Sequence, residues 1–166
     1  MRLFRFLQPL SRDACRETGV LPPRPSRERE LLSSSVRPRV EWLEGDLKGK
    51  SASTPIVIFS HIPLWMIAPE WGWGTEDSAQ ALGYLSRFGS VTVLNGHIHQ
   101  LMQKVEGNVT FHTARSTAFP QPAPGTAPAP GPKLVPAGEL RKWLGVRDVV
   151  YAPTPTNLAV TDSDLS

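Results

Sequence analysis

Two short apolar segments separated by a helical pattern constrain the fold of this chain more than any other feature. Residues 54–61 (TPIVIFSH) and 90–95 (SVTVLN) are rich in β-branched residues and have the length of buried strands. Residues 75–89 between them have the apolar spacing of a helix. A strand, a helix and a second strand in this order predict a mixed fold, α/β or α+β.

The segment 75–89 also contains signals for both ends of its helix. Asp77 can cap the first turn together with Gln80, and Gly89 is placed for a left-handed residue after the last turn. The face expected to be buried consists of Leu82, Leu85 and Phe88.

Further elements are expected on both sides of this unit. Residues 40–47 predict a helix that Gly49 can end, and residues 101–114 predict a hairpin with a Gly-Asn turn. The buried face of the first helix should consist of Val40, Leu43 and Leu47. Towards the C-terminus we expect a short helix closed by Gly145 and then two strands, at 146–152 and 157–163.

Composition divides the chain into a basic arm and a larger body. Residues 1–39 contain nine arginines and four acidic residues, whereas residues 40–166 contain nine Lys or Arg and eleven acidic residues. We expect a disordered or incidental arm at 1–39 and a domain at 40–166, with an irregular loop at 120–136 that holds seven prolines. The net charge of +3 therefore belongs to the arm. Nucleic-acid binding through the arm, or an SH3-type ligand in the loop, is the weaker interpretation.

The sequence shows no targeting or membrane segment. Arg2, Arg5 and Gln8 interrupt the apolar run near the N-terminus, and no apolar run approaches the roughly 18 residues that span a bilayer. A cytoplasmic protein is the default expectation, with export open for a longer relative. The single cysteine, Cys15, excludes an internal disulfide framework. No pattern indicates an oligomeric state.

Three of the four histidines follow the predicted buried strands. His61 closes the first strand, and His97 and His99 follow the second after an Asn-Gly pair. Residues just beyond the carboxyl ends of buried strands point into the crevice where α/β sheets bind ligands. If the two strands are neighbours, three imidazoles meet at one edge. His112 alternates within the predicted hairpin and is expected to be structural.

This arrangement predicts a metal site, because imidazole is a common ligand of zinc and also binds iron and manganese. On a regular strand His97 and His99 would point the same way and could bind one ion. On a turn after Asn95 and Gly96 they could serve two adjacent ions, and Gly96 would let the backbone approach a metal or phosphate closely. A single histidine at a strand end is commonly only a polar terminus, but two such strand ends favour metal binding.

The loop after His61 contains three tryptophans, and two interpretations stay open. Trp65, Trp71 and Trp73 could form a substrate wall above the metal site, since aromatic faces bind bases and sugars. They could equally form a packed loop that covers the end of the sheet.

The segments 42–47 (WLEGDL), 54–65 (TPIVIFSHIPLW) and 90–100 (SVTVLNGHIHQ) resemble the C-terminal half of the calcineurin-like metallophosphoesterase family. The fourth block of that family is a strand that ends in His and is often followed by x-Pro-Leu, and it matches residues 60–64. The fifth block, Gly-His-x-His, matches residues 96–99. The resemblance covers roughly residues 40–114 and implies the C-terminal half of a two-sheet β-sandwich flanked by helices.

The resemblance also implies the chemistry of the site. A dinuclear centre of divalent Mn, Fe or Zn would be expected, with His61 and His97 on one ion and His99 on the other. A metal-bound hydroxide would then attack a phosphomonoester or phosphodiester, such as a small-molecule phosphate ester or a nucleotide.

The first three blocks of the family are missing from these residues. These blocks are Asp-x-His, Gly-Asp-x-x-Asp and Gly-Asn-His-Asp/Glu. No Asp-x-His occurs here, and the Gly-Asp at 45–46 and the Gly-Asn at 107–108 lack the remaining residues of their blocks and lie in the predicted helix and the hairpin turn. No catalytic residue can therefore be identified, and three neutral imidazoles do not balance two divalent cations. We expect a truncated phosphoesterase with weak or no activity alone. The alternative is a non-catalytic fragment of the same fold that binds one metal ion or a partner.

Overall fold

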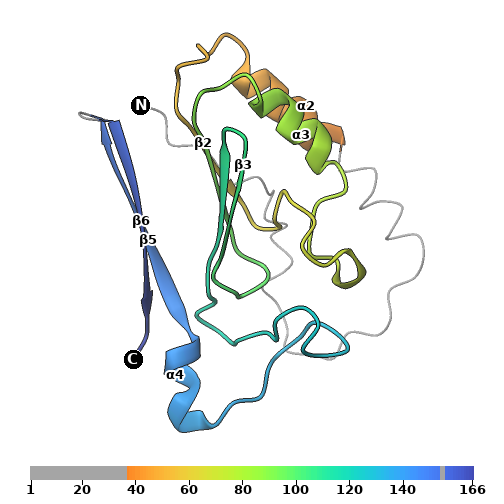
Figure 1. Cartoon of the computed structure of the whole chain (residues 1–166), viewed down its shortest axis with the longest axis vertical. Helices are drawn as coiled ribbons and strands as arrows, with labels where there is room; N and C mark the ends of the chain where they lie inside the picture. The colour runs from red at the N-terminus through yellow and green to blue at the C-terminus, as the bar shows by residue number, and fades with distance from the viewer. Residues whose placement is uncertain (1–36, 154–155) are drawn as a thin grey trace.

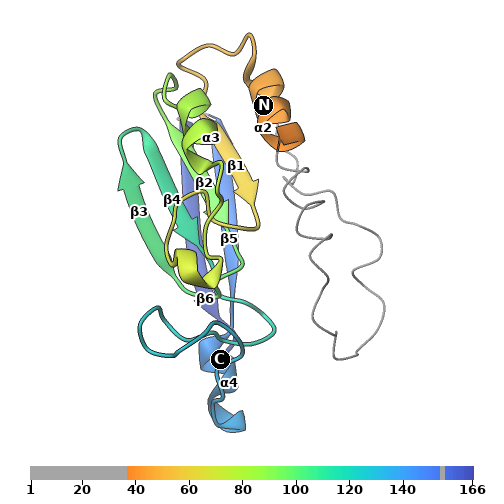
Figure 2. The same cartoon turned by 90° about the vertical axis from the view of Figure 1, so that its right-hand side faces the viewer.

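The computed structural model describes residues 37–153 and 156–166. These residues form a mixed fold of three α-helices, two short 3-10 helices and six strands in two sheets. The expected class of α and β fold is therefore confirmed. Figures 1 and 2 show three layers, with helices α2 and α3 on one face of a four-stranded sheet and a two-stranded sheet on its other face. Within the described residues, no helix combines the length and apolarity needed to cross a membrane.

The four-stranded sheet places the two predicted strands side by side. β1 (Ile56–Ser60), β2 (Val91–Asn95) and β4 (Val109–Thr113) are parallel neighbours in that order. β3 (Met102–Glu106) pairs antiparallel with β4 in the predicted hairpin, where Gly107 has a φ of 58°. Ser60 and Asn95, the last residues of β1 and β2, are paired in the register, so the chain leaves both strands at the same carboxyl edge of the sheet.

Helices α2 (Arg37–Leu47) and α3 (Ser78–Leu85) cover one face of this sheet (Figure 2). α2 begins inside the segment expected to be an arm, and Pro38 lies in its first turn, where a missing N–H costs no helical hydrogen bond. The rest of that arm, residues 1–36, lies outside the described residues. The predicted buried face of α2 is confirmed. The core beneath the helices consists of Leu43, Leu47, Ile56, Ile58, Leu64, Trp65, Ala81, Leu85, Phe88, Val91, Val93, Val109 and Phe111.

The ends of α3 differ from the prediction. The side chain of Asp77 makes no capping hydrogen bond, so the predicted capping pair does not form. Gly89 is not left-handed, and the helix ends earlier, at Leu85. The side-chain amide of Asn108 donates to the carbonyls of Leu85 and Phe88, at 3.0 and 2.7 Å. The turn of the hairpin thus supplies the helix end with the hydrogen bonds that a glycine cap was expected to provide.

The C-terminal part of the chain forms the second sheet. Residues 120–136 are irregular, as predicted, and lead into η2 (Ala137–Glu139) and α4 (Leu140–Trp143). β5 (Gly145–Pro153) and β6 (Thr156–Asp164) then pair antiparallel, which confirms the two predicted strands. Gly145 does not close the short helix but is the first residue of β5.

Candidate metal centre

His61 and His97 meet at the edge that β1 and β2 share. The Nε2 atom of His61 and the Nδ1 atom of His97 are 3.4 Å apart, and the rings are T-shaped with centroids 5.2 Å apart. Two nitrogens bound at about 2.0–2.1 Å to one tetrahedral ion lie roughly 3.3–3.4 Å from each other. The two imidazoles therefore have the spacing of two ligands of one ion.

Residues 96–99, which we call the histidine turn, have an uncommon backbone conformation. The Ile98 N–H donates to the Gly96 carbonyl at 2.7 Å and closes a three-residue γ-turn around His97. His97 and His99 have φ angles of 66° and 55°, and among the described residues no other non-glycine residue has a positive φ. Such conformations cost on the order of 1–3 kcal/mol each and cluster at functional sites. The two histidines thus lie on a turn and not on a regular strand.

Ile98 anchors the histidine turn in the protein interior. Its side chain is fully buried and packs with Ala68 and Trp73 in a small second core. His97 and His99, on either side of it, are only half-buried. A buried apolar residue between two polar ones therefore fixes the turn while leaving both imidazoles at the surface.

Asn95 and Gly96 join the two histidine-bearing segments. The Asn95 side-chain amide donates to the carbonyls of Ser60 and Ile62, at 2.9 and 3.3 Å. The Gly96 N–H donates to the carbonyl of His61 at 3.1 Å. A Cβ atom at Gly96 would stand 3.5 Å from Nδ1 of His61, an ordinary van der Waals contact, so Gly96 contributes through its N–H and its closeness to that ring. Both residues predicted to support the site therefore contact the chain around His61.

A main-chain carbonyl fixes the orientation of His99. Its Nδ1 atom lies 2.8 Å from the carbonyl oxygen of Phe119, whose ring packs edge-on against the imidazole with centroids 4.6 Å apart. Because a carbonyl can only accept, Nδ1 carries the proton and Nε2 keeps its lone pair. Nε2 is thus the nitrogen of His99 that can bind a metal.

The surroundings favour neutral imidazoles. Burial lowers the pKa of His97, and the nearby His61 and His99 lower it further. Burial also lowers the pKa of His99, against the Phe119 hydrogen bond, which raises it, and His61 adds a further lowering. Neutral imidazole is the form that binds metals. Even so, the described residues contain no group of three or more His, Cys, Asp or Glu side chains that could hold an ion.

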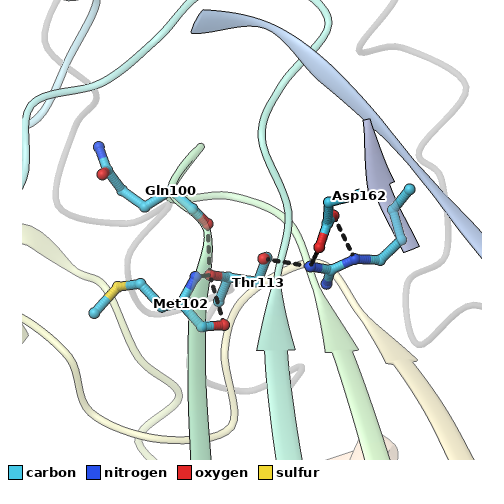
Figure 3. Close-up of polar contacts among 5 residues, drawn as sticks. Gln100, Met102, Thr113 and Asp162 are labelled. Atoms are coloured by element: carbon cyan, nitrogen blue, oxygen red, sulfur yellow. Dashed lines mark hydrogen bonds and ion pairs between the residues drawn. The ribbon is translucent and has the colours of Figure 1, made fainter. Parts of the chain in front are cut away.

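A polar network supports the chain that leaves the histidine turn (Figure 3). The hydroxyl of the fully buried Thr113 donates to the carbonyl of Gln100 at 2.6 Å and accepts from the N–H of Met102 at 2.9 Å. The Thr113 carbonyl accepts from Arg147 at 3.0 Å, and Arg147 forms a two-point ion pair with Asp162 at 2.8 and 2.6 Å. Thr113 therefore links the edge that carries the histidines to the second sheet.

The three tryptophans lie in different environments. Trp65 is 8% exposed and packs on Phe111 in the main core, and Trp73 is 1% exposed in the second core. Trp71, in η1 (Pro69–Trp71), is half-buried and contacts Trp73 edge-on with centroids 4.9 Å apart. The rings of Trp65 and Trp73 are covered, which favours the packed-loop interpretation for these two residues, whereas Trp71 stays a candidate for the substrate wall.

Sequence reasoning missed two residues, Phe119 just before the proline-rich loop and Gln121 within it. Besides Phe119, the Gln121 side chain contacts the histidine turn, because its amide donates to the carbonyl of His97 at 2.7 Å. Gln121 is buried, although it lies in a segment predicted to be an irregular loop. A lone glutamine among prolines was the only local signal. His112, by contrast, lies within β4, as expected for a structural histidine.

No protein-family model and no curated protein sequence matches this chain. The resemblance to metallophosphoesterases therefore stays a prediction from residues 42–47, 54–65 and 90–100.

Proposed function

We propose that this chain provides the histidine part of the dinuclear metal centre of a calcineurin-like, metal-dependent phosphoesterase. The observation that supports the proposal is the 3.4 Å separation between Nε2 of His61 and Nδ1 of His97, at the common carboxyl edge of two parallel strands. A helix layer over two sheets is also compatible with half of a two-sheet sandwich.

The chain would hold two ions through different residues. His61 and His97 would bind one divalent Mn, Fe or Zn ion, and His99 would face the neighbouring ion with Nε2. When bound, such ions lower the pKa of coordinated water and neutralise charge on a phosphoryl oxygen. The protein orients the ligands, since Phe119 fixes the tautomer of His99 and Asn95 holds the two strand ends together.

The described residues bring imidazoles but no carboxylate to this edge. Neutral ligands leave the charge of two divalent ions uncompensated, and a bridging carboxylate has no substitute here. We therefore propose that hydrolysis of phosphomonoesters or phosphodiesters requires carboxylate ligands from additional polypeptide, and that the 166 residues alone are weakly active or inactive.

Titration with Co²⁺, followed by its visible absorption, tests the site directly. The chain should bind Co²⁺ with nitrogen ligation, and both His61→Ala and His97→Ala should weaken binding at least tenfold. His112→Ala is the matched control and should leave binding unchanged. If the variants of His61 and His97 bind Co²⁺ as well as the original chain does, the proposed centre is wrong.

A non-catalytic role is the second candidate, favoured by the fact that His61 and His97 have the spacing of ligands of one ion while the described residues form no group of three metal-binding side chains. A shortened relative of the family would then bind a single metal ion or a partner. Fusing a polypeptide that carries the missing Asp and Asn blocks ahead of Arg37 separates the candidates. Gain of nitrophenyl phosphate hydrolysis with manganese supports the phosphoesterase, whereas stoichiometric metal without hydrolysis supports the second candidate.

A further inference from the structure

The proline-rich loop and the residue before it, Phe119, hold the histidine turn from outside the core. The Phe119 carbonyl accepts from Nδ1 of His99, and the Gln121 side-chain amide donates to the His97 carbonyl. The side-chain amide of Gln100, just after the turn, donates in return to the Gln121 carbonyl at 2.5 Å. Three hydrogen bonds thus join Gln121 of the loop and Phe119, the residue just before it, to a short stretch of chain that contains both histidines.

The loop itself is closed around Gln121. The N–H of Gly131 donates to Oε1 of Gln121 at 3.2 Å, and the N–H of Lys133 donates to the Pro120 carbonyl at 2.8 Å. The Gln121 side chain is 8% exposed, and both ends of its amide are used. Proline fixes φ and lowers the entropy that the loop loses when it adopts one conformation. The sequence of this segment therefore suits a rigid support.

The histidine turn requires contacts that hold its unfavourable backbone conformation in place. Two histidines with positive φ persist only where the surroundings over-determine them. Ile98 holds the turn from the core side. The γ-turn does not use the His97 carbonyl, and this carbonyl accepts its hydrogen bond from the Gln121 side-chain amide.

We propose that Gln121 and Phe119 are positioning residues of the metal centre, an inference that rests on the proposed function. Gln121 holds the backbone of His97 in the conformation that brings its ring to His61. The Phe119 carbonyl keeps the proton of His99 on Nδ1, so that Nε2 faces the metal. Removing a residue that hydrogen-bonds to a metal ligand and orients it typically weakens metal affinity by about 10–100-fold.

The first experiment uses the metal-free chain. Nitrogen-correlated NMR of its imidazoles should show His99 with the proton on Nδ1, and nuclear Overhauser contacts should join the rings of His61 and His97. Gln121→Met should abolish the contacts between the rings. A proton on Nε2 of His99, or ring contacts unchanged by Gln121→Met, would overturn the inference whether or not the chain binds metal.

The second experiment measures Co²⁺ affinity of the full chain. Gln121→Met should weaken binding about 10–100-fold, whereas Gln103→Met, the same change at an exposed position of β3, should not. In a His97→Ala background, Gln121→Met should cause no further loss of Co²⁺ affinity. If Gln121→Met acted through a general loss of structure, the affinity would fall further in that background as well. Gln121→Asn, too short to span both partners, replaces the methionine variant if that variant does not fold.

The outcomes separate the two proposals. Absence of Co²⁺ binding by the original chain contradicts the proposed function, and the NMR contacts then decide the role of Gln121 alone. Co²⁺ binding that Gln121→Met and Gln121→Asn leave unchanged overturns the positioning role and leaves the metal centre standing.

Discussion

Replacing His97 with glycine should give a more stable protein than replacing it with alanine, the reverse of the usual order. Both variants lack the imidazole and its contacts, so the difference in their free energies of unfolding reports the backbone. At a φ of 66° the Cβ atom of alanine crowds the backbone, at a cost of about 1–2 kcal/mol that glycine avoids. His99, with a φ of 55°, should show the same order.

Urea unfolding of the metal-free chain, kept in a chelator, measures this difference. For an m-value of about 1–2 kcal/mol/M, a difference near 1.5 kcal/mol moves the midpoint by roughly 1 M. A shift of this size is several times the usual error of a midpoint.

His112 provides the matched control, because it lies in β4 and does not have a positive φ. There the glycine variant should be less stable than the alanine variant by about 0.5–1 kcal/mol. Alanine at position 97 that equals or exceeds glycine in stability would refute the argument that the histidine turn is strained.

Three further outcomes follow from buried and titrating groups. Ile98→Ala should lower the free energy of unfolding by about 2–5 kcal/mol, because the side chain is fully buried, and a loss under about 1 kcal/mol in urea would contradict its role as an anchor. The lowered pKa values of His97 and His99 mean that, below about pH 6.5, the unfolded chain takes up protons that the folded chain does not. Stability should therefore fall as pH decreases from about 6.5, and replacing both histidines with glutamine should reduce this slope in urea unfolding at several pH values. Asp162→Ala should destabilise the protein by about 1–3 kcal/mol and by more than Arg147→Met, because it removes the carboxylate from a guanidinium that is only 9% exposed, whereas Asp162 itself is 29% exposed; the opposite order in thermal unfolding would contradict this reasoning.

The helices and strands that hold the site could be predicted because their signals are local. The β-branched segments at 54–61 and 90–95 became β1 and β2, and the spacing of apolar residues at 40–47 identified the buried face of α2. Apolar residues that recur with the period of a helix or a strand lie on one face of that element, so the sequence pattern alone predicts which face is buried.

The features that shape the site depend on distant contacts, and the sequence did not predict them. The hydrogen bond from Gln121 to His97 spans 24 positions, and no local pattern marks either residue as its partner. The Asn-Gly pair suggested a turn, yet the positive φ angles fall on His97 and His99 and not on Gly96. In the same way, the end of α3 was assigned to Gly89, although Asn108 from the hairpin supplies its hydrogen bonds.

Closure of the proline-rich loop has a practical consequence for labelling this protein. The bonds from Lys133 to Pro120 and from Gly131 to Gln121 bound the tip of the loop, and Gly125 is exposed within it. Lengthening a closed loop is inexpensive, at about 0.6 kcal/mol for each doubling, and exposed tips tolerate insertions. A peptide tag or a fluorophore inserted at Gly125 would therefore lie beyond the hydrogen bonds that join Gln121 to the histidine turn, and if the proposed metal centre forms, its emission could be tested as a signal of a bound paramagnetic ion.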